Sequence, residues 1–174
     1  EGRHAVYELL TAGARAVREV WVSSEVGDAP IVDDIRELAD DRRVPVRDVA
    51  KAKFYAQARC EAPQGVLALA APLPEFDLDD LLEVRRLPGH SKGGSRARQA
   101  PFMIALDGVT DPGNLGAVLR SAECAGVTGA ILPRHRAVNV TPAATKAAAG
   151  AVEHLPMALV GGLPNALAKL KESG

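Results

Sequence analysis

Two polar residues, Asn114 and Arg120, lie in the stretch of the sequence that best suits a ligand site. A continuous apolar run at 102–106 precedes a turn with the sequence DPGN at 111–114, and a second apolar run follows at 129–132. The pattern predicts a strand–helix–strand unit. Its turn then lies at the carboxyl end of the strands, where open α/β sheets bind ligands. Asn114 starts the helix, and Arg120 projects opposite its apolar side at about 100° per residue.

Each of these residues also has an ordinary explanation. Asn114 is suited to cap the helix, because its side chain accepts a hydrogen bond from a backbone N–H that lacks a helical partner. Arg120 is equally well explained as a solvated surface residue. Gly126 ends the expected helix, whose apolar stripe comprises Leu115, Val118, Leu119, Ala122 and Ala125. Spacing alone leaves both alternatives open.

The string DGVTDPGNLGAVLRSAECAGV at 107–127 resembles the first conserved motif of the SpoU (TrmH-like) RNA ribose 2′-O-methyltransferases, which belong to the knotted SPOUT class. Three further segments resemble that family: EGRHAV at 1–6, QGVLAL at 64–69 and KAAAGAVEHLP at 146–156. Pro63 departs from the pattern, because a histidine is common there. The resemblance covers nearly all of the chain.

The resemblance implies a site and a reaction. Asn114 and Arg120 match residues of the family's catalytic centre, where the arginine activates a ribose 2′-hydroxyl. The implied cofactor is S-adenosylmethionine, and the implied partner is RNA, above all guanosine in 23S rRNA. The family pairs as homodimers. It also carries two later motifs that form the knot and cofactor pocket, so we expect the cofactor-binding residues beyond Gly174. The chain begins with Glu rather than Met, and we expect a piece that is inactive alone.

The fold expected is α/β, with two parts and a linker. Residues 1–71 predict a small α/β sandwich, with helices at 2–12, 33–39 and 49–59 and strands at 17–23, 44–46 and 65–70. The resemblance makes this an RNA-binding domain. Residues 72–100 predict a flexible charged linker, although Leu78, Leu81 and Leu82 have helical spacing. Residues 101–174 predict the first half of a Rossmann-like, normally knotted SPOUT parallel-sheet domain.

Several basic residues are candidate RNA contacts, each with a solvated surface position as the alternative. Arg3 and His4 open the first helix, where the helix dipole favours phosphate. A later helix, expected from Pro142 to Ala151, is small on most faces and permits close approach to another helix or a subunit. The candidate RNA-binding residues are Arg3, His4, Arg15, Arg134, Arg136 and Lys146.

The composition of the chain limits which classes of protein it can belong to. With 21 basic and 22 acidic residues the net charge is −1, so an RNA-binding surface must be a local patch. Cys60 and Cys124 are isolated, which predicts free thiols and no metal site. No apolar run approaches the roughly 18 residues of a membrane span, so we expect a cytoplasmic protein. A non-catalytic RNA-binding module is the competing function. A dinucleotide-binding domain fits less well, because DGVTDPGNLG lacks GxGxxG spacing.

Overall fold

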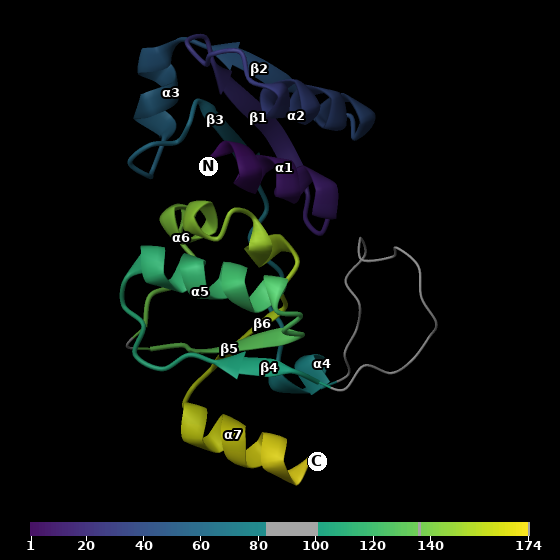
Figure 1. The fold of residues 1–174 in the computed structure, drawn as a ribbon, viewed down its shortest axis with the longest axis vertical. Coiled ribbons are helices and arrows are strands. Elements are labelled where there is room, and N and C mark those ends of the chain that lie inside the picture. Colours follow the sequence, from purple (N-terminus) through teal and green to yellow (C-terminus); the bar gives the residue numbers. More distant parts are fainter. Residues whose placement is uncertain (83–100, 136, 174) are drawn as a thin grey trace.

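The computed structural model describes residues 1–82, 101–135 and 137–173. These residues form two three-stranded sheets, one above the other in Figure 1, each with helices on both faces. The expected α/β class is confirmed.

The first sheet has the strand order β2-β1-β3. β1 pairs in parallel with β2 and antiparallel with β3, so the sheet is mixed. The six elements, in chain order, are α1 (Arg3–Ala12), β1 (Val17–Ser23), α2 (Pro30–Asp41), β2 (Val46–Val49), α3 (Lys51–Gln57) and β3 (Val66–Ala70).

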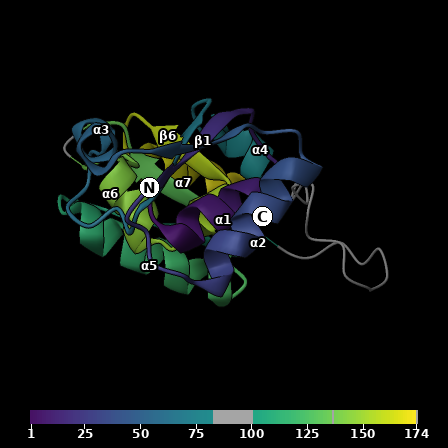
Figure 2. The same cartoon turned by 90° about the horizontal axis from the view of Figure 1, so that it is seen from above.

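Successive side chains of β1 point to opposite faces of the sheet, and helices cover both faces. Val20 and Val22 are fully buried beneath α1 and α2, in one core with Val6 and Ile35. Trp21 points to the opposite face, where α3 contributes the buried Phe54. Seen from above in Figure 2, α1 and α2 lie side by side, with α3 apart from them.

The second sheet is parallel, with the strand order β4-β5-β6. An isolated β-bridge also joins Phe76 to Ala158, which belongs to β6. Its elements are α4 (Leu78–Leu82), β4 (Met103–Ala105), α5 (Pro112–Cys124), β5 (Gly129–Pro133), α6 (Pro142–Ala147), the 3₁₀ helix η1 (Ala151–Glu153), β6 (Met157–Val160) and α7 (Leu163–Glu172).

The two faces of this sheet have separate cores. Ala130 and Leu132 of β5 face α5 and α6, in a cluster with Leu115 and Leu119. Ile131, between them, faces the other side, where α4 and α7 pack in a second cluster. Figure 1 accordingly shows α5 and α7 on opposite sides of the strands.

Several sequence-based boundaries were wrong. Phe102 is 53% exposed and lies before β4, which is an edge strand among the described residues. Ala125 is exposed rather than part of the buried stripe, since α5 ends at Cys124. In the first sheet, strand β2 starts at Val46, after Pro45, whose carbonyl accepts a bond from Val20 N.

The expected linker also differs from the structure where it is described. Leu78 and Leu81 are buried in the core with α7, so 72–82 is folded onto the second sheet rather than flexible. These leucines bury an apolar face, which a flexible linker lacks. The basic part of the expected linker, residues 83–100, lies outside the described residues.

The small helix is shorter than predicted. α6 ends at Ala147, and Ala149 and Gly150 then take positive φ angles of 50° and 91°. A Cβ at Gly150 would collide with the Glu8 side chain of α1, including a 2.7 Å approach to Cγ. The helix therefore breaks where α1 approaches its backbone.

Candidate active site and RNA-facing surface

The first turn of α5 is capped by Asp111, not by Asn114. The Asp111 carboxylate accepts a 2.7 Å hydrogen bond from the backbone N–H of Asn114, and Pro112 occupies the first helical position. The expectation that Asn114 caps the helix was wrong, because Asp111 already holds the cap position three residues earlier. The Asn114 side chain is exposed and has no hydrogen-bond partner among the described residues. It is free to contact a ligand.

Arg120 projects away from the core, as its position in the helix predicted. The buried residues of α5 are Leu115, Gly116, Leu119 and Ala122, whereas Arg120 is exposed. Within the part of the chain that the structure describes, its guanidinium has no ion pair. Asn114 and Arg120 lie six residues apart, or about 9 Å along the helix axis at 1.5 Å per residue. Six residues at about 100° each also place the two side chains about 120° apart around the helix.

The loops at the carboxyl edge of the second sheet are tied to one another. The backbone N–H of Val138, after β5, donates a 2.9 Å bond to the Val109 carbonyl, after β4. Gly161 and Gly162 follow β6 at the same edge, with open space around the position of a Cβ on either. This edge therefore combines the α5 turn, a fixed loop and room for a ligand, as open α/β sheets commonly do.

Arg3 and Lys146 lie close together, although Arg3 is in α1, which packs on the first sheet, and Lys146 is in α6, which packs on the second. The amide of Arg3 donates to Gln64 Oε1 at 3.0 Å, and its Nε donates to the Gln64 carbonyl at 3.2 Å. A Cβ on Gly2 would lie 3.2 Å from Lys146 Cγ and 3.3 Å from Gln64 Oε1. The structure thus brings two predicted RNA contacts together around Gly2. His4, beside them in α1, is exposed.

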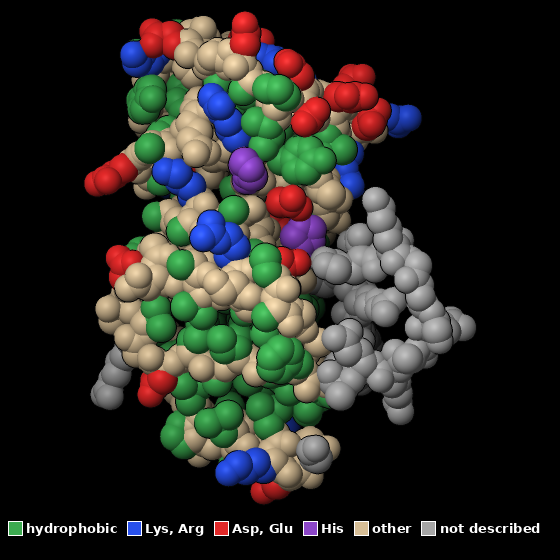
Figure 3. All heavy atoms as spheres, viewed as in Figure 1, with side chains coloured by type: hydrophobic (Ala, Val, Ile, Leu, Met, Phe, Trp, Pro, Cys, Tyr) green, Lys and Arg blue, Asp and Glu red, His purple; other side chains and the backbone are tan. Residues whose placement is uncertain are grey.

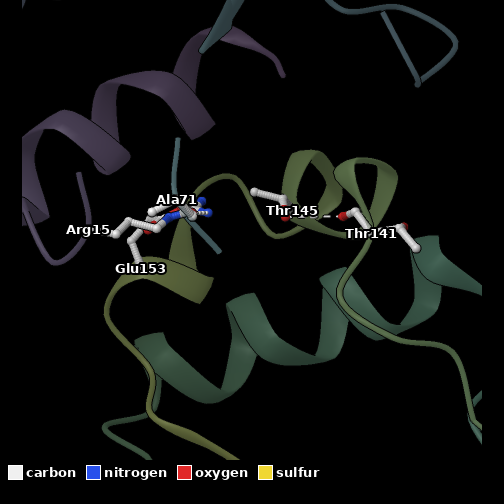
Figure 4. A network of polar contacts seen from close by, with 5 residues as sticks. All are labelled: Arg15, Ala71, Thr141, Thr145 and Glu153. Atoms are coloured by element: carbon white, nitrogen blue, oxygen red, sulfur yellow. Dashed lines mark hydrogen bonds and ion pairs between the residues drawn. The ribbon is translucent and has the colours of Figure 1, made fainter. Parts of the chain in front are cut away.

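Arg15 takes part in a contact between the two sheets. Its Nε donates to Glu153 Oε2 at 2.9 Å, its Nη2 binds the other carboxylate oxygen, and its Nη1 donates to the Ala71 carbonyl at 2.7 Å (Figure 4). The Arg15 side chain is only 15% exposed, and that of Glu153 is fully buried. The guanidinium is thus occupied within the chain, and the structure does not support Arg15 as an RNA contact.

A second contact between the sheets lies beside this ion pair. Nε2 of His154 is 2.8 Å from Oε2 of Glu8, the same α1 residue that Gly150 approaches. On the face drawn in Figure 3, Lys, Arg and His side chains gather at the junction of the upper and lower halves. The junction is therefore both polar and closely packed.

The two remaining predicted RNA contacts lie after β5. Arg134 is exposed, and its Nη2 reaches the Leu159 carbonyl at a long 3.4 Å. Arg136 lies outside the described residues.

Thr141 caps α6 as the Thr-Pro sequence predicts, with Oγ1 accepting a bond from Ala144 N at 3.2 Å; its carbonyl also accepts a bond from the Thr145 hydroxyl (Figure 4). α6 packs on α5, with Ala144 in one core cluster with Leu115 and Leu119.

Neither cysteine forms a disulfide. Burial, and then a hydrogen bond with the Glu1 carboxylate, raise the pKa of the Cys60 thiol to about 11. Cys124 is exposed. In the described ranges, no three His, Cys, Asp or Glu side chains gather as metal ligands would, and no helix is long and apolar enough to span a membrane.

Sequence reasoning missed Asp111, Glu8, Glu153 and His154. Asp111 carried a usable signal, since Asp followed by Pro is a typical start of a helix. No local sequence signal points to Glu8, Glu153 or His154, because an ion pair such as that between Arg15 and Glu153, 138 positions apart, depends on how the two sheets dock.

Two family descriptions match successive parts of the chain. Residues 1–76 match "RNA 2′-O ribose methyltransferase substrate binding", and residues 101–174 match the "SpoU rRNA Methylase family". The chain is 36% identical over 176 residues to the 23S rRNA (guanosine-2′-O-)-methyltransferase RlmB of Pseudomonas putida, with 99% of this chain and 65% of that protein covered.

Solved structures show the same fold. The SpoU methyltransferase AviRb of Streptomyces viridochromogenes, crystallised with AdoMet, superposes with a TM-score of 0.67 at 23% identity, covering 97% of this chain and 58% of AviRb. An rRNA methyltransferase of Sinorhizobium meliloti superposes with a TM-score of 0.64 at 24% identity, covering 92% of this chain and 53% of that one. By the two matched regions, which together cover most of the chain, the chain belongs to the SpoU rRNA methylase family.

Proposed function

We propose that the whole protein transfers a methyl group from S-adenosylmethionine to a ribose 2′-hydroxyl of RNA, with guanosine in 23S rRNA as the target. The chain spans about two thirds of the length of its relatives, so the activity is proposed for the complete protein. The observation that carries the proposal is α5: among the described residues its start presents Asn114 without a side-chain partner at the carboxyl edge of a parallel sheet, and Arg120 is exposed and unpaired further along the same helix.

The reaction requires charge stabilisation at an oxygen. S-adenosylmethionine supplies an electrophilic methyl group when it is bound. The 2′-hydroxyl would release its proton to water as its oxygen bonds the methyl carbon and the methyl–sulfur bond breaks, and a nearby cation would stabilise the negative charge that develops on the oxygen. Arg120 suits this role better than that of a base, because a guanidinium group holds its proton too tightly to accept another group's proton at neutral pH. Asn114, free of the cap, is suited to position the ribose by hydrogen bonding.

We assign none of the described residues to S-adenosylmethionine. We propose that residues 1–71 bind RNA and that residues 101–174 begin the catalytic domain, with 72–100 joining them. Arg3, His4, Lys146 and Arg134, together with Arg136, are the proposed RNA contacts. We further propose a cytoplasmic homodimer, as the family resemblance implies.

The proposal is tested by analysing the product. The whole protein is incubated with 23S rRNA and S-adenosylmethionine, the RNA is digested to nucleosides, and these are separated by liquid chromatography with mass spectrometry. We expect 2′-O-methylguanosine to accumulate. Methylation confined to bases, or RNA binding without any methylation, would overturn the proposal and favour a different methyltransferase or a binding module.

A further inference from the structure

A cavity of about 680 Å³ lies between the two sheets. α1 and β3 line it from one side, and β6, the 72–76 segment and the loop after β5 line it from the other. Its apolar lining includes Leu69, Met157 and Leu159. This volume lies within the roughly 300–1,000 Å³ typical of small-ligand pockets.

Two exposed arginines from different halves of the chain line this cavity. Arg59 follows α3, and Arg134 follows β5. Among the described residues neither guanidinium has a carboxylate partner, and the one polar contact, from Arg134 to the Leu159 carbonyl, is long at 3.4 Å. Two unpaired arginines beside one cavity form a site for an anion that accepts several hydrogen bonds, as phosphate does.

The other charges of the lining do not neutralise these arginines fully. The carboxylate of Glu1 accepts bonds from the backbone amides of Arg59 at 2.7 Å and Cys60 at 2.9 Å. Glu153 forms an ion pair with Arg15. Amide donors leave the charge of Glu1 in place, so the carboxylates of Glu1 and of Glu75, which is exposed on the 72–76 segment, both oppose an incoming anion.

The buried pair of Arg15 and Glu153 fixes the spacing of the two walls. Glu153 belongs to η1, on the side of the second sheet that faces α1, Arg15 precedes β1, and the same guanidinium holds the Ala71 carbonyl at the start of the 72–76 wall. All three lie on or beside the cavity lining. The docked arrangement of the sheets therefore shapes the cavity.

We propose that this cavity binds one nucleotide of the substrate RNA, with its phosphate between Arg59 and Arg134 and its base against the apolar lining. Gln57, Asn139 and Thr145, which also line the cavity, supply donors and acceptors for the edge of the base. The inference rests on the proposed function and adds a second anchoring point to it, apart from the Arg120 site. The occupant is RNA rather than a free small anion, because the cavity combines a phosphate site with apolar area for a base.

The test measures the affinity of the whole protein for a fluorescently labelled 23S rRNA fragment by anisotropy over a series of salt concentrations. Arg59→Gln and Arg134→Gln should each weaken binding by about tenfold, the effect of one charged hydrogen bond, and lower the salt slope by about 1. Arg36→Gln is the matched control, because Arg36 pairs with Asp48 and does not line the cavity. Its affinity should stay unchanged.

Two further variants separate the cavity from general charge effects. Glu75→Gln should strengthen binding, since it removes an opposing carboxylate. Ala70→Trp should weaken binding by filling the cavity without changing the charge, and urea unfolding confirms that the variant is folded. Wild-type affinity and salt slope in both arginine variants would overturn the cavity site but leave the proposed function intact. Failure of the wild-type protein to bind the RNA at all would overturn the proposed function itself.

Discussion

At the scale of single residues, the start of α5 separates a structural role from a chemical one. Asp111 accepts the capping bond at 2.7 Å, and Asn114 contributes only its backbone N–H to it. Removing the Asp111 side chain is therefore expected to lower stability, whereas removing the Asn114 side chain is expected to lower methyl transfer.

Asp111→Ala should lower the free energy of unfolding by about 1 kcal/mol, the usual cost of a lost cap. Asn114→Ala should leave it within about 0.5 kcal/mol, as for an exposed residue without partners, yet reduce methyl transfer by the whole protein. Urea unfolding and methyl-transfer rates measure the two effects. Equal loss of stability in both variants would show that Asn114 takes part in the cap after all.

Cys60 is expected to be unreactive at neutral pH. Burial, together with the Glu1 hydrogen bond, raises the pKa of its thiol to about 11. The thiolate is the nucleophile, so alkylation should be slow at pH 7.5 and accelerate about tenfold per pH unit until the pH nears that pKa. Iodoacetamide labelling followed by peptide mass spectrometry measures the rate. Alkylation of Cys60 at pH 7.5 as fast as that of a free cysteine in solution would contradict the environment described.

At the scale of elements, α5 and α6 touch through small residues. Gly116 is buried against α6, where a Cβ would lie 2.6 Å from Ala147 Cβ and 2.7 Å from Ala148 N, and nearer still to the Ala144 carbonyl oxygen. The expected close approach of the alanine-rich helix to another helix is confirmed, and the neighbour is α5.

Gly116→Ala should therefore destabilise the protein. Alanine gains about 1 kcal/mol of helix propensity, but overpacking costs roughly 1–3 kcal/mol, and the atoms it meets here are largely backbone. Gly27→Ala is the control, because nothing lies within 4 Å of its Cβ position. Urea unfolding compares the two variants. A Gly116→Ala protein more stable than wild type would show that α6 shifts freely away from α5.

The sequence predicted the elements whose signals are local. Alternation along 17–23 correctly predicted strand β1 with Val20 and Val22 on one face, and Thr141-Pro142 correctly started α6. The exposed position of Arg120 followed from helical geometry alone. In each case the deciding interactions lie within a few residues of one another along the chain.

Features that depend on docking could not be predicted in this way. α6 ends early because Glu8 approaches Gly150 from 142 positions away, and Arg15 is buried because Glu153 lies on the other sheet. Residues 72–82 looked like linker because their acidic residues outnumber the leucines that pack on α7. Local spacing contains no information about such partners.

At the scale of the whole molecule, the pair of Arg15 and Glu153 holds the two sheets together. Glu153→Ala should cost about 3–5 kcal/mol, because it leaves a largely buried guanidinium without its counter-ion. Arg36→Ala, which breaks an exposed pair within the first half, should cost no more than about 1 kcal/mol. Urea unfolding measures both.

Solution scattering should also show a larger radius of gyration for Glu153→Ala than for wild type. The double variant Arg15→Met with Glu153→Met should lose less stability than the two single changes summed, since it removes both charges at once. Additive losses, with no change in the radius of gyration, would mean that other contacts fix the docking.

The central claim is that Arg120 assists attack by a ribose 2′-hydroxyl. The most direct measurement gives the whole protein 23S rRNA and methyl-labelled S-adenosylmethionine, then hydrolyses the RNA with alkali, which cannot cleave beside a 2′-O-methylated ribose. Wild type and the neighbouring control Ser121→Ala should leave the label in alkali-resistant dinucleotides. Arg120→Ala should form them at least about a hundredfold more slowly, with RNA affinity retained, and Arg120→Lys should remain impaired because an ammonium lacks the planar fork. Normal kinetics in Arg120→Ala would contradict the claim and leave Arg120 a surface residue.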